Sequence, residues 1–495
     1  MPDVVVTGEP LTPADVLAVA RGGAGVRLAA EALANLAAGR EIVERLASGD
    51  RPAYGISTGF GALATRHIPA ESRAQLQRSL VRSHAAGMGP AVEPEVVRAM
   101  MLLRLRTLAT GRTGVRPVVA ETLARLIASG VTPAVPEHGS LGCSGDLAPL
   151  AAVALALMGE GDAGVADPVV LEEKEGLALI NGTDGMLAML LLACADLASL
   201  LTHLDVAAAM SVEALLGTDR VFAADLQALR PHPGQAASAA NLRNLLAGSA
   251  IVASHREGDT RVQDAYSLRC APQVHGAARD TLAHAAAVAE RELAATIDNP
   301  VVLPDGRVES NGNFHGAPVG YVCDFLAVAI ADVGSMAERR TDRMLDKGRS
   351  HGLPPFLADD PGVDSGLMIA HYTQAGMVAE NRRLAVPASA DNVPTSGMQE
   401  DHNSLGWGAA RKLRQAVHNL RRIVAVELVT AARALDLRAP LAPAAGTAAA
   451  RDAIRAAVPG PGPDRWLAPE LAAAEDLVED GAILRAVAAA GVEVA

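Results

Sequence analysis

Helical spacing of apolar residues dominates this chain. The spacing predicts helices over 72–86, 150–158, about 281–296 and 404–435. A further long apolar helix is expected from about Asp184. A strand pattern is limited to one small hairpin over 301–308, in which Pro304-Asp305-Gly306 supplies the turn. The pattern therefore predicts a mainly α-helical protein with few short strands.

Composition supports the same fold class. Half of the 495 residues are hydrophobic, but only 2% are aromatic, so Ala, Leu and Val must fill the core. Such a core suits long, closely packed helices better than sheets. The net charge is −13 and the Lys and Arg residues are dispersed. This charge distribution argues against nucleic acid or an anionic membrane surface as a partner.

The four cysteines are Cys143, Cys194, Cys270 and Cys323. They lie far apart in the sequence and show no metal-ligand spacing, which fits a reducing compartment. The N-terminus has no secretory pattern. The apolar run from Met186 to Ala195 is interrupted by Asp196 and is too short to span a bilayer. We therefore expect a soluble cytoplasmic protein without a metal.

One small-residue loop differs from the helical background. Residues 139–150 read Gly-Ser-Leu-Gly-Cys-Ser-Gly-Asp-Leu-Ala-Pro-Leu, with Asp146 as a candidate N-cap of the helix that follows. In the Cys143-Ser144-Gly145 triplet, the Gly145 amide nitrogen can attack the Cys143 carbonyl carbon. Loss of two waters, one carrying the Ser144 hydroxyl, would leave a methylidene-imidazolone (MIO), which is a strong electrophile. Gly145 allows the backbone bend that this reaction needs.

This loop resembles the prosthetic-group loop of the histidine and aromatic amino acid ammonia-lyases. Their usual triplet is Ala-Ser-Gly, so Cys143 is a departure, although cyclisation uses that residue only through its carbonyl. In having a Cys at this position, the loop resembles that of the actinobacterial histidine ammonia-lyases. The resemblance implies an autocatalytic MIO from Cys143-Ser144-Gly145 and no dissociable cofactor. Taken alone, Ser-Gly-Asp would favour an ordinary Gly-rich helix-capping turn, so the decision depends on the whole twelve-residue match and on the other segments.

Two N-terminal segments match the same family. Residues 54–61, Tyr-Gly-Ile-Ser-Thr-Gly-Phe-Gly, predict an exposed loop that holds Tyr54, the catalytic base by resemblance. Ser57 replaces the family's Asn. Ser83-His84, in the last turn of a predicted helix, is similar to the family's histidine-type substrate selector. A packed Tyr and a helix-terminal His are the alternative interpretations.

Two further segments carry polar site residues. Residues 174–183, Lys-Glu-Gly-Leu-Ala-Leu-Ile-Asn-Gly-Thr, resemble the family segment whose Asn, here Asn181, binds the MIO oxygen. Gln263, Tyr266 and Arg269 are three residues apart, so one helical turn would stack them on one face. By resemblance Tyr266 also contacts the MIO oxygen, and Arg269 clamps the substrate carboxylate. A capping Asn and a solvated polar face remain the alternatives.

The last two matches concern the substrate pocket. Phe314, in Gly-Asn-Phe-His, resembles a residue that walls the pocket, although a core aromatic is the alternative. Glu400, in Gln-Glu-Asp-His, resembles a residue placed near the substrate amine and side chain. The Glu-Asp-His cluster lacks a second His at metal-ligand spacing, and a solvated helix start is the alternative.

The resemblance implies a long central helical bundle and one continuous catalytic unit. An N-terminal part over 1–200 would carry the MIO loop, and 201–495 would form the bundle core and C-terminal helices. The family also implies a homotetramer with active sites built from three subunits and a small amino acid as substrate. The expected reaction is elimination of ammonia from L-histidine to give trans-urocanate, the first step of histidine degradation.

Two alternatives stay open. One is a phenylalanine or tyrosine ammonia-lyase or an MIO-dependent aminomutase, although Ser83-His84 and Glu400 disfavour aromatic substrates. The other is a catalytically inactive relative, because Ala152 stands where relatives commonly have His. The fumarase–aspartase superfamily is disfavoured because its Gly-Ser-Ser-x-Met-Pro-x-Lys loop does not occur in this sequence.

Overall fold

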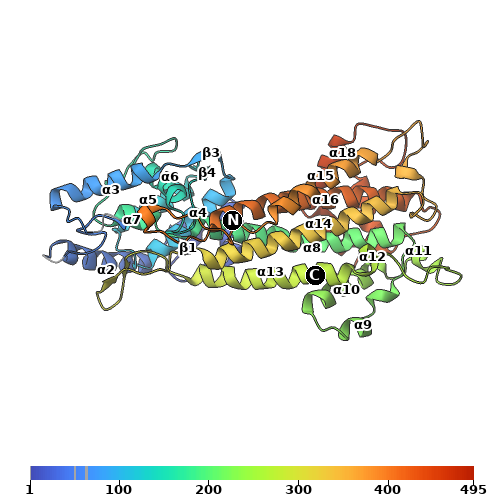
Figure 1. Cartoon of the computed structure of the whole chain (residues 1–495), viewed down its shortest axis with the longest axis horizontal. Helices are drawn as coiled ribbons and strands as arrows, with labels where there is room; N and C mark the ends of the chain where they lie inside the picture. Colours follow the sequence, from blue (N-terminus) through green and yellow to red (C-terminus); the bar gives the residue numbers. More distant parts are fainter. Residues whose placement is uncertain (1, 50–51, 62–64) are drawn as a thin grey trace. The chain divides into compact units, whose positions relative to one another are not determined.

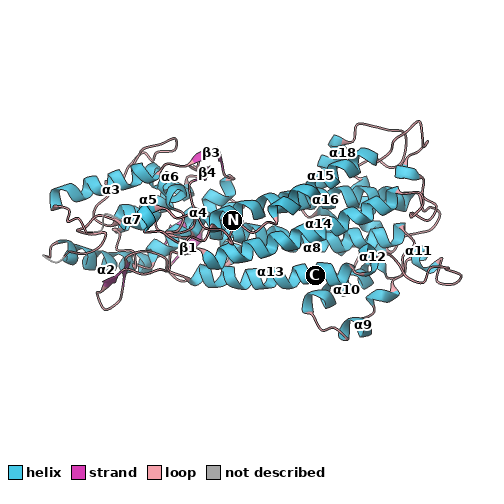
Figure 2. Cartoon of the chain, in the orientation of Figure 1, coloured by secondary structure: helices cyan, strands magenta, loops and turns pink. Residues whose placement is uncertain are grey.

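Helices make up nearly all of the regular structure (Figure 2). The computed structural model describes residues 2–49, 52–61 and 65–495. Contacts divide the chain into two compact units. The first unit is Met1–Leu192, Ala286–Asp324 and Pro387–Arg411, and the second is Ala193–Ala285, Phe325–Val386 and Lys412–Ala495. The prediction of a mainly α-helical protein with few short strands is confirmed.

The three small sheets found among the described residues all belong to the first unit. Its helices are α1 (Pro13–Ala20), α2 (Ala30–Ala47), α3 (Ala70–His84), α4 (Pro94–Ala109), α5 (Pro117–Ala128), α6 (Leu147–Leu157) and α7 (Glu175–Ile180), with the 3₁₀ turn η4 (Ser396–Met398). β1 (Val4–Val6) pairs in parallel with β2 (Val26–Leu28). The antiparallel pairs are β3 (Met88–Ala91) with β4 (Pro136–His138) and β5 (Val301–Val302) with β6 (Val308–Glu309). The predicted hairpin over 301–308 is therefore confirmed.

Three helices of the first unit surround the loop that carries the unusual triplet. α3, α6 and α7 contact one another and lie together in Figure 1. α6 begins directly after the triplet, and its third residue is Pro149, which is tolerated there because first-turn N–H groups have no partner within the helix. Gly159, with φ +75°, follows the helix end. The expected helix over 150–158 is thus confirmed with shifted bounds.

The buried Arg104 on α4 fixes the turn between α7 and α8 (Asp184–Ala214). Its guanidinium donates to the carbonyls of Ala178 (3.1 Å) and Asn181 (3.2 Å) and to the Asp184 carboxylate (3.0 Å). Because Arg104 is only 2% exposed, these bonds replace the water that the charged group has lost. The turn that carries Asn181 is therefore held rigidly.

Helices also build the second unit, some of them shared with the first. Its own helices are α9 (Ala224–Ala228), α10 (Pro233–Leu246), α11 (Ala250–Ala253), α12 (Tyr266–Arg269), α15 (Met368–Leu384), α17 (Ala445–Arg455), α18 (Ala468–Glu479) and α19 (Ala482–Ala489), with 3₁₀ turns η2 (Arg220–Phe222) and η3 (Pro355–Leu357). Residues of α8, α13 (Ala271–Ala294), α14 (Ala317–Leu345) and α16 (Gly406–Asp436) belong to both units.

The bounds of α13 differ most from expectation, since it begins ten residues before position 281. The cause is a buried polar residue early in the helix. His275 is fully buried, and its Nδ1 lies 2.7 Å from the Asp205 carboxylate. Apolar periodicity counts such a position as surface, so the first turns of α13 did not stand out as a buried helix.

Two helical stretches among the described residues are long and apolar enough to cross a membrane by length and composition: Glu175–Ala214 and Ala317–Leu345. The apolar run expected to end at Ala195 thus continues as helix, so its length alone does not exclude a membrane span. Burial is the better criterion, because 72% and 56% of the two apolar windows are buried inside the protein. This burial is consistent with core helices of a soluble protein.

Candidate active site

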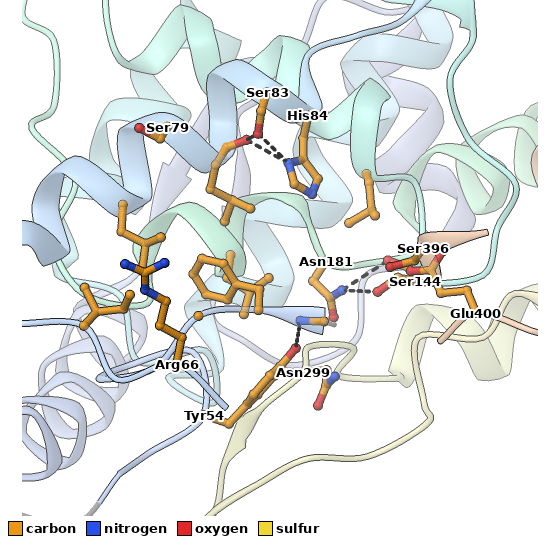
Figure 3. Close-up of a pocket in the computed structure, with 18 residues that line it drawn as sticks. Tyr54, Arg66, Ser79, Ser83, His84, Ser144, Asn181, Asn299, Ser396 and Glu400 are labelled. Carbon is orange, nitrogen blue, oxygen red and sulfur yellow. Dashed lines mark hydrogen bonds between the residues drawn. The ribbon is translucent and has the colours of Figure 1, made fainter. Parts of the chain in front are cut away.

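A cavity of about 530 Å³ lies in the first unit. Its polar lining, drawn in Figure 3, comes from several segments that are far apart in the sequence: Tyr54, Arg66, Ser79, Ser83, His84, Ser144, Asn181, Asn299, Ser396 and Glu400. Apolar side chains, including Phe60, Leu80 and Leu147, form the remaining wall. The mixture of apolar walls with a few converging polar groups is typical of a small-molecule site.

The triplet loop bends because two of its glycines adopt left-handed backbone. Gly142 has φ +69° and Gly145 has φ +74°, a backbone region that residues other than glycine rarely adopt. A Cβ added to Gly145 would lie 2.3 Å from the carbonyl oxygen of Gly182. Gly145 is therefore required both by its backbone conformation and by close packing against the α7–α8 turn.

Asn181 holds the central residue of the triplet. Its side-chain amide donates to the Ser144 carbonyl oxygen (3.1 Å) and to the Ser144 hydroxyl (2.8 Å) (Figure 3). Asn181 is 2% exposed, and its Oδ1 is buried without a hydrogen-bond partner among the described residues. A buried acceptor without a partner is costly, so it marks a place where another group is expected to bind.

Asp146 follows the triplet, and the sequence suggested it as the N-cap of α6. The structure confirms that position, but the Asp146 side chain makes no capping bond to α6 within the described residues. Its carboxylate instead accepts the amide N–H groups of Gly185 and Met186, both at 2.9 Å, in the first turn of α8. Burial raises the pKa of Asp146 to about 7, against the effect of these bonds. Asp146 thus ties the loop to the start of α8.

Tyr54 also lines the cavity. Its phenol oxygen accepts the Gly61 amide N–H at 3.1 Å. The expectation of an exposed loop is wrong, because Gly55 to Gly59 are buried. The reason is that Ser57 turns inward and its hydroxyl accepts the Ala53 amide N–H at 2.9 Å.

His84 ends α3 and presents one ring nitrogen for binding. Its Nδ1 lies 2.9 Å from the Leu80 carbonyl oxygen and 3.1 Å from the Ser83 hydroxyl. A carbonyl only accepts, so we assign the proton to Nδ1, which leaves Nε2 as an acceptor. Burial lowers the pKa of His84, partly opposed by the Leu80 carbonyl and Glu400. The ring is therefore neutral at pH 7.

Glu400 enters the cavity from a short closed loop. The backbone groups of Thr395 and Glu400 pair with each other, and the Thr395 hydroxyl donates to Glu400 Oε2 at 3.0 Å. The Cys143 thiol lies 3.0 Å from the same oxygen. Burial, followed by the contact with Glu400, raises the pKa of Cys143 to about 12, so this thiol stays protonated at neutral pH.

Six predicted site residues do not line the cavity among the described residues. Two of them, Cys143 and Gly145, flank Ser144, which does line it. Phe314 is half-buried in the turn after β6 of the first unit. Gln263, Tyr266 and Arg269 belong to the second unit. The predicted helical stacking of these three is wrong for Gln263, which is exposed and precedes the four-residue helix α12. Arg269 lies over the Tyr266 ring, 4.6 Å from its centroid, with Tyr266 69% exposed.

The cavity also contains residues that the sequence did not single out: Arg66, Asn299 and Ser396. Asn299 lies in Asp298-Asn299-Pro300, which the sequence indicated only as a helix end. Nothing in the sequence around Arg66 or Ser396 indicates a cavity, because the residue pattern of an exposed loop does not depend on the cavity that the loop lines. Throughout the described residues, no group of three or more His, Cys, Asp or Glu side chains is arranged to hold a metal ion.

The arrangement points to a class of protein. An Asn-held Cys-Ser-Gly bend, a phenol, a neutral imidazole and a carboxylate suit elimination from a small polar substrate. The sequence profile of the aromatic amino acid lyases matches residues 11–456. The chain belongs to the aromatic amino acid lyase family and is an ammonia-lyase.

Individual relatives refine this placement. The chain is 65% identical to a histidine ammonia-lyase of Streptomyces avermitilis and 64% identical to one of Streptomyces griseus, each over 98% of both chains. Among solved structures, it is similar to a tyrosine aminomutase of Streptomyces globisporus, with TM-score 0.92, 38% identity and 98% of both chains covered. It is also similar to a histidine ammonia-lyase of Trypanosoma cruzi, with TM-score 0.90, 36% identity and coverage of 99% and 96%.

Proposed function

We propose that this chain converts L-histidine to trans-urocanate and ammonia, the first step of histidine degradation. The observation that carries the proposal is the meeting of Tyr54, His84, Ser144, Asn181 and Glu400 in one cavity. The histidine ammonia-lyases of Streptomyces, at 64% to 65% identity, support the choice of substrate. We also propose that the protein is cytoplasmic.

Members of this family use an MIO group that they form autocatalytically, and we propose that Cys143-Ser144-Gly145 forms it here. The residues present fit the group in two respects. Gly145 sits in a bend with no room for a Cβ, and the buried Asn181 donates to both oxygens of Ser144. Asn181, with Tyr266, would hold the ring oxygen. When present, the ring supplies an electrophilic carbon that activates the substrate amine.

The chain's own residues perform the remaining tasks. The Tyr54 phenol oxygen, oriented by the Gly61 N–H, removes the proton from the substrate β-carbon. The Nε2 atom of His84 accepts a hydrogen bond from the substrate imidazole, since Nδ1 is committed to Leu80. The Glu400 carboxylate contacts the ring from the other wall and assists proton movement. Together they place histidine in a reactive geometry.

The substrate carboxylate requires a further group. We propose that Arg269 binds it in a bidentate manner, with Gln263 beside it and Phe314 walling the pocket. The Arg269 Nε is buried without a hydrogen-bond partner among the described residues, so this guanidinium has an unused donor. We also propose a homotetramer whose copies share their active sites, with no nucleic acid and no membrane as partner.

The test is one incubation with L-histidine, followed by ultraviolet absorbance of urocanate. Parallel samples contain L-phenylalanine and L-tyrosine. Urocanate from histidine alone is the expected result, and cinnamate or coumarate would overturn the assignment of His84 and Glu400. The intact mass is measured on the same sample. A deficit of two waters is expected, whereas a full mass without turnover would identify an inactive relative.

A second candidate is an aminomutase, which returns ammonia to the neighbouring carbon. It is favoured by the structural similarity to the tyrosine aminomutase of Streptomyces globisporus, with TM-score 0.92. Both activities need the same proton removal, so the cavity alone does not separate them. Chromatography of the products decides, because an aminomutase gives a β-amino acid that accumulates beside the alkene.

A further inference from the structure

We propose that Cys143 and Thr395 are positioning residues for Glu400. Both hold one oxygen of its carboxylate and thereby direct the other oxygen to the substrate. This inference rests on the proposed histidine elimination, in which Glu400 contacts the substrate ring. It gives a role to the Cys143 side chain, which the cyclisation chemistry does not use, because only the carbonyl of Cys143 takes part.

The two contacts converge on a single atom. The Cys143 Sγ and the Thr395 Oγ1 each lie 3.0 Å from Glu400 Oε2. Within the described residues, Oε1 of Glu400 accepts no hydrogen bond, and Glu400 lines the cavity. A thiol and a hydroxyl both donate to a carboxylate. The asymmetry therefore leaves Oε1 as the oxygen available for a ligand.

The loop that carries Glu400 explains why such positioning is needed. From 391 to 400 only Thr395 and Glu400 are even half-buried, and the other residues are exposed. Ser396, Gly397 and Met398 between them all have positive φ, from +53° to +71°. Such a turn has little support from the core. The Thr395–Glu400 backbone pair closes the turn, and the two side-chain donors fix the carboxylate within it.

The thiol is suited to a permanent donor role. With its pKa raised to about 12 by burial and by the nearby carboxylate, Cys143 keeps its proton at neutral pH and is a poor nucleophile. The contact also joins two parts of the site. The residue that opens the Cys-Ser-Gly triplet holds the carboxylate proposed to contact the substrate ring, so both are placed together.

The kinetic test uses four single variants: Cys143→Ala, Cys143→Ser, Thr395→Val and Thr395→Ser. We expect Thr395→Val to raise KM for L-histidine about tenfold and Cys143→Ala about threefold, as expected for one strong and one weak donor to a charged group. The value of kcat should change far less. The Ser variants restore a hydroxyl donor and should recover most of the loss. Cys194→Ala and Thr281→Val, placed in the second unit, are the matched controls.

Combining the two substitutions tests whether they act on the same atom. In Cys143→Ala/Thr395→Val, the rise in KM should exceed the product of the single effects, because in each single variant the remaining donor still partly restrains Oε2. Intact mass shows whether each variant retains the two-water deficit of the wild type. A variant with that deficit and wild-type KM would overturn the role of the substituted residue. If the Ser variants do not restore KM towards the wild-type value, the rise in KM is due to lost packing and not to a lost donor.

Infrared spectroscopy provides a readout that is independent of turnover. The difference spectrum of wild type minus Cys143→Ala isolates the Cys143 S–H stretching band, which hydrogen bonding shifts to lower frequency. We expect a lowered band that moves to the free-thiol position in Glu400→Ala. A band already at the free-thiol position in the wild type would overturn the Cys143 contact. If the wild type does not turn over L-histidine, the positioning role falls with the proposed function, while this band still decides the contact.

Discussion

The two groups of predicted site residues behave differently in the structure. Tyr54, His84, Ser144, Asn181 and Glu400 converge on one cavity within the first unit. Gln263, Tyr266 and Arg269 belong to the second unit, and Tyr266 is 69% exposed. One group is organised by contacts within its own unit, such as Asn181 to Ser144 and Thr395 to Glu400. In the other group, the Arg269 guanidinium lies over the Tyr266 ring.

This difference teaches that the residues proposed for the chemistry and for ring recognition are brought together by contacts within one unit. The residues proposed to bind the substrate carboxylate do not line that cavity in the described part of the chain. Tyr266 is one of several aromatic side chains that are half or more exposed, together with Phe325, Tyr372 and Trp466. The proposed sharing of sites between copies of the chain explains why α12 (Tyr266–Arg269) carries such residues on its surface.

The largest effect should come from removing the centre of the first group. Ser144→Ala should lower kcat by roughly a thousandfold, equal to ~4 kcal/mol of activation free energy, because the proposed electrophile cannot form. Circular dichroism and the melting temperature should stay near those of the wild type. Ser48→Ala, at the exposed end of α2, is the matched control. Turnover near wild type in Ser144→Ala would exclude the proposed chemistry.

The second prediction addresses the other group. Arg269→Lys should raise KM by roughly 30-fold, since Lys keeps the charge but loses a bidentate pair worth ~2 kcal/mol. Inactive Tyr54→Phe and weakened Arg269→Lys chains are then expressed together. If copies share sites, mixed oligomers contain intact sites and regain activity. Activity no higher than the sum of the separate variants would show that both groups serve the same chain's site.

A smaller effect should distinguish substrates within the cavity. His84→Leu removes the Nε2 acceptor and should lower kcat/KM for L-histidine about tenfold, the size of one hydrogen bond. Any turnover of L-phenylalanine should not fall, since that substrate has no ring N–H to donate. An equal loss for both substrates would mean that His84 supports the cavity structurally and does not select the ring.

The last prediction concerns stability and the interior of the second unit. Burial lowers the pKa of His203 to about 4, with its Nδ1 2.9 Å from the Ser199 carbonyl. The unfolded chain, with an ordinary His pKa near ~6.5, binds the proton more readily, so stability falls as pH drops from there towards 4. The loss from this group should reach ~2 kcal/mol by pH 5.

This loss is measured as the change in melting temperature between pH 7.5 and pH 5. His203→Gln should reduce that change, while His138→Gln, an exposed control in the first unit, should leave it as in the wild type. An identical acid response in His203→Gln and wild type would place the acid sensitivity elsewhere. Such a result would remove one contrast between the two units.

The sequence predicted the fold class well because apolar periodicity is a property of each helix separately. α3, α6 and α16 lie close to their expected ranges. It did not predict the early start of α13, where His275 is satisfied by Asp205 on another helix. The return of residues 286–324 and 387–411 to the first unit likewise has no signal in apolar periodicity. Those results depend on contacts between distant residues, which periodicity does not describe.

The candidate site was predictable where a residue's own segment carries the information. The Cys143-Ser144-Gly145 bend is an example, since its small residues and glycine mark it, whereas Asn181 was indicated only by the resemblance of residues 174–183 to the family segment. The burial of the Tyr54 loop, the role of Asp146 at α8, and Arg66 in the cavity were missed. Each depends on what lies opposite in space. The contact between Cys143 and Glu400 joins residues 257 positions apart and has no local signal.

The bonds around Gly142 imply an order of events during synthesis. Its carbonyl oxygen accepts the amide N–H of Gly316 at 3.0 Å and the hydroxyl of Ser404 at 2.8 Å. The ribosome makes Ser404 262 residues after Gly142, so the neighbouring triplet cannot reach this geometry while most of the chain is still untranslated. The full set of contacts around the triplet loop is therefore available only after residue 404 has been synthesised.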